Sequence, residues 1–171
     1  MENYIYQKRL KQIWQGALAK YETGDHNPNN YFSESTLKEL SSIGLNSMDV
    51  YDYVEDYVSR GEPDFETFLL VSSVRRDYLS IVQGGLKTGK LLDSDALPAK
   101  EEMVNGIVWL PRIMHKAWAK LRGELPPETM YGCGGDRRFF KEHNIHPADF
   151  LRAAWAYEEN ESKLVEWVIS Q

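Results

Sequence analysis

The segment from Tyr131 to Arg138, YGCGGDRR, holds the only cysteine of the chain between glycine residues. If Asp136 caps a helix that begins at Arg137, then Cys133 lies just before a helix N-terminus and close to two arginines. Both features favour the thiolate form of a cysteine, which is its nucleophilic form. A nucleophilic cysteine also needs a base, and the histidines that could supply it are His115, His143 and His146. The alternative is that the glycines shape a tight turn and Cys133 fills a small apolar gap.

Five basic residues form a second candidate site: Arg112, Lys116, Lys120, Arg137 and Arg138. The first three are four residues apart, so a helix places them on one face, away from its apolar stripe. The other two begin a second predicted helix, whose free backbone amides also attract anions. We therefore predict a site for a carboxylate or phosphate, with a solvated basic face in which Asp136 pairs with an arginine as the alternative. The predicted ligand-binding residues are Arg112, Lys116, Cys133, Asp136, Arg137 and Arg138.

A third group of charged residues surrounds Arg75, in the middle of the most apolar segment of the chain. A buried arginine needs an anionic partner. The preceding segment offers Asp49, Asp52 and Asp56 at helical spacing. We predict an internal ion-pair network, with a ligand site between the two helices as the less favoured interpretation.

Metal and cofactor sites find little support. His143 and His146 have a spacing compatible with metal ligands, but Pro147 makes His146 a helix cap, and no second thiolate is present. The sequence contains no P-loop, no dinucleotide-binding glycine motif and no nucleophile elbow. We therefore expect no metal and no cofactor.

The charge of the chain excludes some classes of function. The net charge of −6 argues against a general nucleic-acid binder, although residues 112–141 carry seven basic and three acidic side chains. No apolar run approaches the roughly 20 residues that a membrane span needs, so no membrane partner is expected. The N-terminal residues lack the features of a signal peptide, and a single cysteine fits a reducing compartment. We expect a cytoplasmic protein.

Helical periodicity governs almost every segment that must position these residues. Helices are predicted over 4–21, 35–42, 47–60, 64–83, 100–104, 110–121, 137–143, 147–157 and 161–169. Asn46, His146 and Asn160 are the predicted caps of three of them, and Pro63 suits a first turn. No segment alternates with a period of two, which predicts an all-α fold without a substantial sheet. We expect two packed helical halves: residues 1–84 with a buried central helix at 64–83, a linker at 85–98, and residues 99–171.

Several short motifs follow one another in the second half in a distinctive order. They are Leu110-Pro111-Arg112 at the start of a helix that carries Lys116 and Lys120, Gly132-Cys133 with Asp136-x-Arg138-Phe139, Ile145-x-Pro147-x-x-Phe150-Leu151, and Glu166-Trp167-Val168. With these motifs, roughly residues 99–171 resemble a bacterial domain of unknown function. Its members often have an acidic residue where this chain has His115. The resemblance implies a recurring unit with Arg112, Asp136 and Arg138 in its pattern, and it implies no activity.

Three hypotheses on function remain open. The favoured one is a non-enzymatic helical module that binds a small anionic ligand or a protein partner through the basic residues of 112–141. The second is a thiol-dependent enzyme with Cys133 as its catalytic residue. The third is a structural or oligomeric role, because the aromatic-rich first half has more apolar surface than one unit readily buries.

Overall fold

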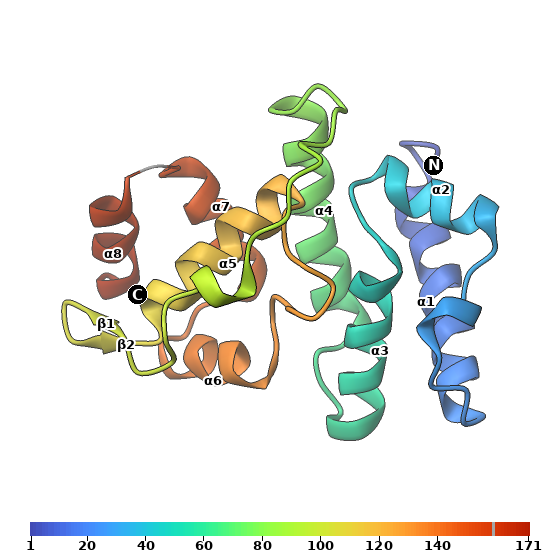
Figure 1. The fold of residues 1–171 in the computed structure, drawn as a ribbon, viewed down its shortest axis with the longest axis horizontal. Coiled ribbons are helices and arrows are strands. Elements are labelled where there is room, and N and C mark those ends of the chain that lie inside the picture. Colours follow the sequence, from blue (N-terminus) through green and yellow to red (C-terminus); the bar gives the residue numbers. More distant parts are fainter. Residues whose placement is uncertain (159) are drawn as a thin grey trace. The chain divides into compact units, whose positions relative to one another are not determined.

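The structure, a computed structural model, describes residues 1–158 and 160–171 and divides them into two compact units, Met1–Leu86 and Lys87–Gln171. α-Helices dominate both units, and the strands among the described residues form one short hairpin (Figure 1). The predicted all-α class is therefore confirmed. Within the described residues, no helix combines the length and the apolar character needed to cross a membrane.

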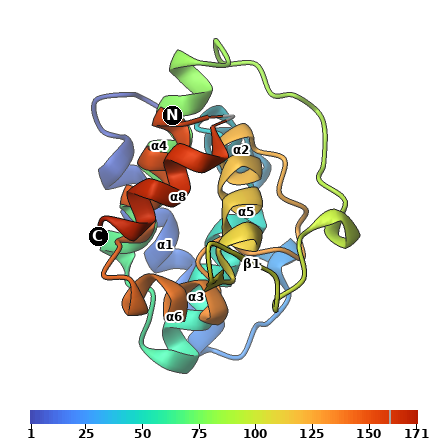
Figure 2. The ribbon, with the colours of Figure 1, turned by 90° about the vertical axis from the view of Figure 1, so that its left-hand side faces the viewer.

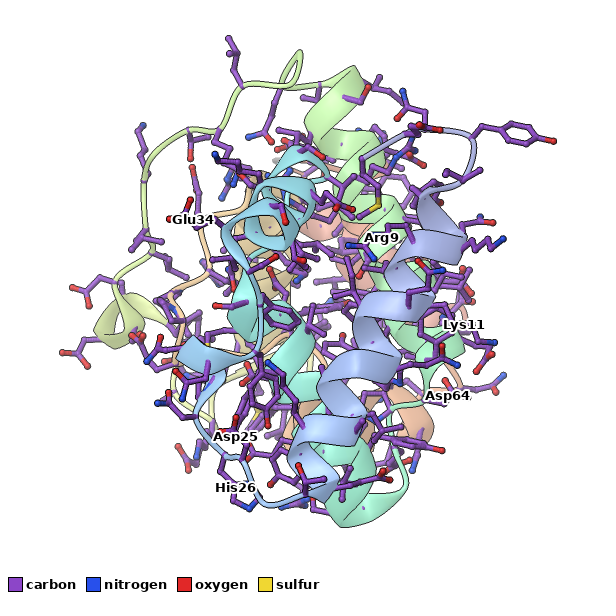
Figure 3. All side chains as sticks on the ribbon, turned by 90° about the vertical axis from the view of Figure 1, so that its right-hand side faces the viewer. Arg9, Lys11, Asp25, His26, Glu34 and Asp64 are labelled. Atoms are coloured by element: carbon purple, nitrogen blue, oxygen red, sulfur yellow. The ribbon has the colours of Figure 1, made fainter. Side chains whose placement is uncertain are left out.

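The N-terminal unit, whose residues are all described, is built from four α-helices and one turn of 3-10 helix at Pro28–Asn30. The helices are α1 (Tyr6–Glu22), α2 (Glu34–Ser42), α3 (Ser47–Arg60) and α4 (Phe65–Ile81). α1 packs against α3 and α4, and Trp14 of α1 contacts the ring of Phe68 in α4. Figure 3 looks onto α1, with Arg9 on the side that faces α2 and Lys11 on the opposite side. The helices of this unit lie within a few residues of their predicted bounds.

The predicted cap of α3 is confirmed in atomic detail. The side chain of Asn46 accepts a hydrogen bond from the backbone N–H of Asp49 (3.1 Å), and the Asp49 carboxylate accepts one from the N–H of Asn46 (2.8 Å). This reciprocal pair satisfies two N–H groups that the helix itself leaves without partners. Asp64 caps α4, so Pro63 precedes that helix instead of lying in its first turn as predicted.

A buried charge lies in the middle of α4. Arg75 is only 1% exposed, and it donates to the carbonyl oxygen of Gly44 through Nε (3.3 Å) and to Oε1 of Gln83 through Nη1 (2.7 Å). The ion-pair network predicted between Arg75 and the acidic residues of α3 stays a prediction. One expectation is corrected: Leu70 is 40% and Ile81 71% exposed, so α4 is not buried on nearly all sides. A helix at this position has neighbours around only part of its circumference.

The C-terminal unit contains four described helices and the hairpin. Its elements are 3-10 helix Ser94–Ala96, β1 (Met103–Val104), β2 (Ile107–Val108), α5 (Leu110–Arg122), α6 (Gly134–Glu142), α7 (Pro147–Ala156) and α8 (Glu161–Ile169). α7 packs against both α5 and α8 (Figure 2). The predicted apolar stripe of α5 is largely confirmed, because Leu110, Ile113, Met114, Ala117 and Leu121 are all buried. The side chain of His146 and that of Asn160 cap α7 and α8, as predicted.

The helix predicted over 100–104 is wrong, because this segment enters the hairpin. β1 pairs antiparallel with β2, with Val104 opposite Ile107. The two turn residues, Asn105 (φ 50°) and Gly106 (φ 78°), both adopt left-handed backbone. Asn-Gly is the preferred sequence for a two-residue hairpin turn of this kind. The turn chemistry outweighed the helical pattern of the few residues before it, and no substantial sheet results.

Gly44 and Gly61 allow the contribution of the Arg75 contact to be measured. Both glycines follow a helix and have positive φ (80° and 76°). A Cβ atom at Gly61 would have nothing within 4 Å, whereas one at Gly44 would lie 2.9 Å from Nε of Arg75. We expect Gly61→Ala to lower the free energy of unfolding by about 1 kcal/mol, the cost of left-handed backbone alone. Gly44→Ala should cost about 1–3 kcal/mol more, because the buried guanidinium must move.

Urea unfolding of the two variants, followed by circular dichroism, measures this difference. Equal losses in the two variants would show that Arg75 adapts freely and that its contact with Gly44 does not constrain the unit.

Candidate functional site

The Asp136 carboxylate joins three segments of the C-terminal unit. The residue is fully buried (0% exposed) and lies in the first turn of α6. Its Oδ1 accepts a hydrogen bond from Nε1 of Trp109 (3.0 Å), and its Oδ2 accepts one from the backbone N–H of Gly132 (2.9 Å). Oδ2 also forms an ion pair with the ammonium group of Lys116. A carboxylate without solvent is thus held by one charged and two neutral donors, which offsets the cost of removing it from water.

Lys116 approaches this carboxylate from α5. Only 2% of the residue is exposed, and its ammonium nitrogen lies 3.4 Å from Sγ of Cys133 as well as against Asp136. Arg112 and Lys116 are four residues apart, so they occupy one face of α5, which Trp109 directly precedes. Long side chains of a helix lean toward its N-terminus. Lys116 therefore directs its ammonium group at the beginning of α6.

Arg112 has a neutral partner. Its Nη1 donates to the carbonyl oxygen of Pro98 (2.7 Å), and the residue is half-buried. No carboxylate among the described residues lies within 4.0 Å of its guanidinium. A carbonyl oxygen solvates a guanidinium without neutralising it, so the positive charge of Arg112 is retained at the start of α5.

The loop before α6 corrects one prediction. α6 begins at Gly134 with Cys133 as its N-cap residue, three positions earlier than the predicted cap at Asp136. Two glycines in a row are poor helix formers, but here the Asp136 side chain binds the N–H of Gly132 and closes the turn. Nη1 of Arg137 donates to the carbonyl oxygen of the same glycine (2.8 Å). Hydrogen bonds between two side chains of α6 and the N–H and carbonyl groups of Gly132 therefore fix where the helix begins.

Trp109 is the residue of this site that the sequence analysis missed. It precedes α5 with left-handed backbone (φ 72°), a conformation that costs a non-glycine residue about 1–2 kcal/mol. A Cβ atom at Gly135 would lie 2.3 Å from Cζ2 of the Trp109 indole, so only glycine fits at that position. The hydrogen bond to Asp136 and this close packing offset the strain. The Asn105-Gly106 turn, three to four residues earlier, was the available signal, since it places Trp109 directly after a hairpin.

The structure brings together four of the six predicted ligand-binding residues at the start of α6. They are Lys116, Cys133, Asp136 and Arg137. Arg112 lies in the first turn of α5, and its described contact is with Pro98. Arg138 is exposed, and it lies two residues beyond Asp136, on another side of α6.

The burial of three basic residues is a further correction. Lys116, Lys120 and Arg137 are 2%, 5% and 6% exposed. These three side chains therefore do not form a solvated basic face. On α5, Lys116 and Lys120 are buried like the apolar residues, instead of lying on a separate exposed face. The physical reason for Lys116 is its pairing with a carboxylate that is itself buried. Asp136 thus pairs with a lysine of α5, where the alternative interpretation expected an arginine.

The histidines considered as bases for Cys133 have other contacts. Nδ1 of His115 lies 2.9 Å from the carbonyl oxygen of Pro111, and Nδ1 of His143 lies 2.9 Å from that of Phe139. Nδ1 of His146 accepts the cap hydrogen bond of α7. None of the three forms a described hydrogen bond with Sγ, and no group of three or more metal-ligating side chains occurs among the residues described.

Comparison with known proteins finds a family match in the C-terminal unit. Residues 95–171 match the family described as a domain of unknown function, DUF5069, which confirms the resemblance found in the sequence. No curated protein and no solved structure matches the chain. All residues of the site lie within the matched part, and the family carries no described activity that could be transferred to them.

The Lys116–Asp136 pair can be tested by its effect on stability. We expect Lys116→Met to lower the free energy of unfolding by about 3–5 kcal/mol, because Asp136 is then left as an unpaired buried charge. Lys116→Met combined with Asp136→Asn should recover part of this loss, because the buried charge is removed while the single amide oxygen still accepts from one of the two neutral donors, Trp109 or Gly132. Lys163→Met, at an exposed position of α8, is the matched control and should change stability by less than about 0.5 kcal/mol.

Urea unfolding monitored by circular dichroism measures all three variants. If Lys116→Met and Lys163→Met were equally stable, the buried pair would have no structural importance.

Proposed function

We propose that the C-terminal unit binds a small anion, a carboxylate or a phosphate group, where the N-terminal ends of α5 and α6 meet. The observation that carries the proposal is Arg112. Its half-buried guanidinium contacts a carbonyl oxygen and has no described carboxylate partner, on the face of α5 that also carries Lys116. A partly desolvated arginine that retains its charge is suited to an external anion, which it can hold through two parallel hydrogen bonds.

The beginning of α6 adds further donors. The backbone N–H groups of Gly134 and Gly135 have no acceptor among the described hydrogen bonds, as is usual for the first residues of a helix. The helix dipole also favours an anion at this end. Glycine leaves the backbone accessible to a ligand, although the Trp109 indole covers one side of Gly135.

The buried ion pair beneath these groups removes an obstacle to anion binding. The negative charge of Asp136 would repel an anion, but Lys116 neutralises it directly. The surrounding segment 112–141 carries seven basic and three acidic residues, in a chain whose overall charge is −6. The local field therefore favours an anion where the whole chain does not.

Binding of inorganic phosphate and of acetate to the full chain tests the proposal. Titration followed by amide NMR shifts should give saturable changes in residues of the α5 and α6 N-termini with at least one of the two anions. We expect Arg112→Ala to weaken this binding about tenfold or more, because a charged hydrogen bond is lost.

Arg152→Ala is the matched control for this experiment. Arg152 is a more exposed arginine of the same unit, paired with Asp149, and its replacement should leave the affinity unchanged. The absence of saturable binding for both anions, or an equal effect of the two alanine variants, would contradict the proposal.

A second candidate function is thiol chemistry at Cys133, favoured by one observation. The ammonium group of Lys116 donates a hydrogen bond to Sγ of Cys133 at 3.4 Å, and Cys133 is partly accessible at the N-terminus of α6. If the sulfur is a nucleophile, alkylation of the folded chain by iodoacetamide should proceed several-fold faster than that of glutathione at the same pH. The replacement Lys116→Gln should remove the advantage. A rate equal to or below that of glutathione would leave Cys133 as a packing residue.

A further inference from the structure

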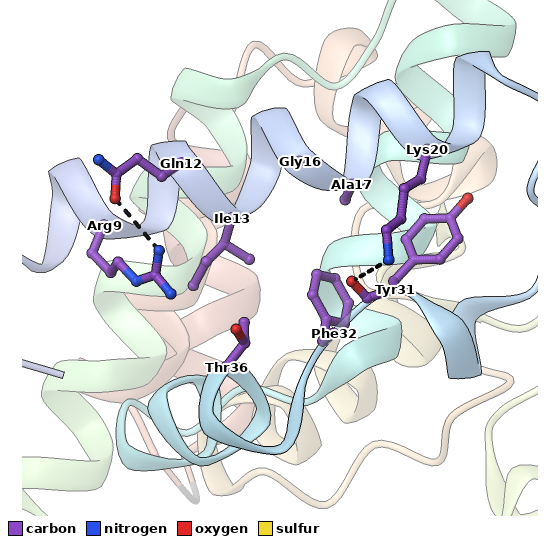
Figure 4. A pocket seen from close by; sticks show the side chains of 9 residues that line it. All are labelled: Arg9, Gln12, Ile13, Gly16, Ala17, Lys20, Tyr31, Phe32 and Thr36. Carbon is purple, nitrogen blue, oxygen red and sulfur yellow. Dashed lines mark hydrogen bonds between the residues drawn. The ribbon is translucent and has the colours of Figure 1, made fainter.

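A hollow in the N-terminal unit, remote in sequence from the site above, has the features of a second binding site. It lies between α1 and the chain segment that leads into α2, and its volume is about 180 Å³ (Figure 4). Its lining includes the apolar side chains of Ile13, Ala17 and Phe32 as well as polar groups, and basic side chains lie at its two ends. This volume is close to that of a cavity of about 150 Å³ known to hold one benzene molecule. The hollow therefore accommodates one small ring or a short branched chain.

A glycine in the middle of α1 keeps this hollow open. Gly16 has ordinary helical backbone, so no left-handed conformation requires glycine there. A Cβ atom at this position would have nothing within 4 Å, so no close packing requires glycine either. Glycine in a helix interior costs about 1 kcal/mol relative to alanine. What the small size of Gly16 does provide is space in the hollow. A longer side chain here would extend toward Phe32 and Thr36, which line the opposite side.

The two basic ends of the hollow differ in charge. At one end, Arg9 forms two hydrogen bonds with the carboxylate of Glu39 (2.7 and 3.1 Å). The hydrogen bond from Arg9 lowers the pKa of Glu39, so the carboxylate is ionised and neutralises the guanidinium. Arg9 also donates a hydrogen bond to Oε1 of Gln12, which Figure 4 shows. This end of the hollow is polar and carries no net charge.

At the other end, Lys20 retains its positive charge. Its ammonium group donates to the carbonyl oxygens of Asn30 (2.6 Å) and Tyr31 (2.9 Å) and lies 5.6 Å from the centre of the Tyr31 ring. No carboxylate of the described residues lies within 4.0 Å of it. Two of the three N–H groups of the ammonium are used, and the third can bind an additional acceptor. The side chain is half-buried, so an anion there would be partly shielded from water.

We propose that this hollow binds a small apolar monocarboxylate, with its carboxylate on Lys20 and its hydrocarbon part against Ile13, Ala17 and Phe32. A single available cation matches a single negative charge, which favours a carboxylate over a doubly charged phosphate ester. The side chains of Ile13, Ala17 and Phe32 give a ring or branched chain an apolar contact within a lining that is otherwise largely polar. This site belongs to the N-terminal unit and does not depend on the anion site proposed at α5 and α6.

Three probes separate the parts of this proposal on the full chain. Benzoate combines the ring with the carboxylate, benzyl alcohol has the ring without the charge, and acetate has the charge without the ring. Amide NMR shifts along α1 and residues 31–36 should show saturable binding of benzoate, with a dissociation constant of roughly a millimolar for a ligand of this size. Benzyl alcohol and acetate should bind to this region about tenfold more weakly or worse.

Two substitutions test the same site from opposite sides. Gly16→Leu fills the hollow while improving the helix, so it should raise the melting temperature and weaken benzoate binding at least about tenfold. Lys20→Gln keeps a donor for the two carbonyls but removes the charge, and it should reduce benzoate binding to the level of benzyl alcohol. The matched controls are Gln15→Leu and Lys8→Gln, exposed positions of the same helix that do not line the hollow.

Three outcomes would overturn the proposal. The first is the absence of saturable benzoate binding to this region, and the second is equal binding by Gly16→Leu and Gln15→Leu. The third is equal binding of benzoate and benzyl alcohol to the parent chain. Loss of benzoate binding in Arg112→Ala but not in Lys20→Gln would assign the ligand to the α5–α6 site instead.

Discussion

The C-terminal unit depends on the burial of one carboxylate, that of Asp136. An ionised carboxylate without solvent is tolerated only when charged and neutral donors surround it. The donors come from Trp109 before α5, from Lys116 within α5 and from the loop at Gly132. These contacts fix where α6 begins and how it meets α5. The left-handed backbone of Trp109 and the glycine required at position 135 follow from the same arrangement.

The N-terminal unit uses a buried charge in a related way. Arg75 in α4 reaches the carbonyl oxygen of Gly44, in the turn between α2 and α3, and that turn must have glycine because the guanidinium lies against it. In both units a charged side chain in a helix is bonded to the backbone of a glycine with positive φ, Gly44 in one and Gly132 in the other. Such contacts are directional, whereas apolar packing is not. Each therefore specifies one arrangement of loop and helix among several that would bury a similar apolar area.

The two proposed binding sites share one electrostatic feature. Arg112 and Lys20 are half-buried, and the described partners of both are carbonyl oxygens. Carbonyl groups stabilise a cation in a fixed direction and leave its charge in place, whereas Glu39 cancels that of Arg9. A chain with net charge −6 thus keeps two local positive sites. The sites differ in their surroundings. Arg112 lies in the first turn of α5, where a helix N-terminus suits a compact anion. Apolar side chains accompany Lys20, which suits an anion with a hydrocarbon body.

Local signals were sufficient to predict most of the helices and several of their caps. Asn46, His146 and Asn160 were identified as caps because the interactions involved span only two or three residues. The turn signal at Asn105-Gly106 was equally local. A helix was wrongly predicted over 100–104 because the helical pattern of those five residues was given more weight than the turn signal. The six candidate ligand residues were also named from type and spacing, and four of them lie around the start of α6. Tertiary structure alone decided which of these charges are buried. Lys116 and Asp136 are 20 residues apart, and neither would be buried without the other. Burial of a charge depends on a partner from a different segment, and the local sequence patterns do not show which distant residue that partner is.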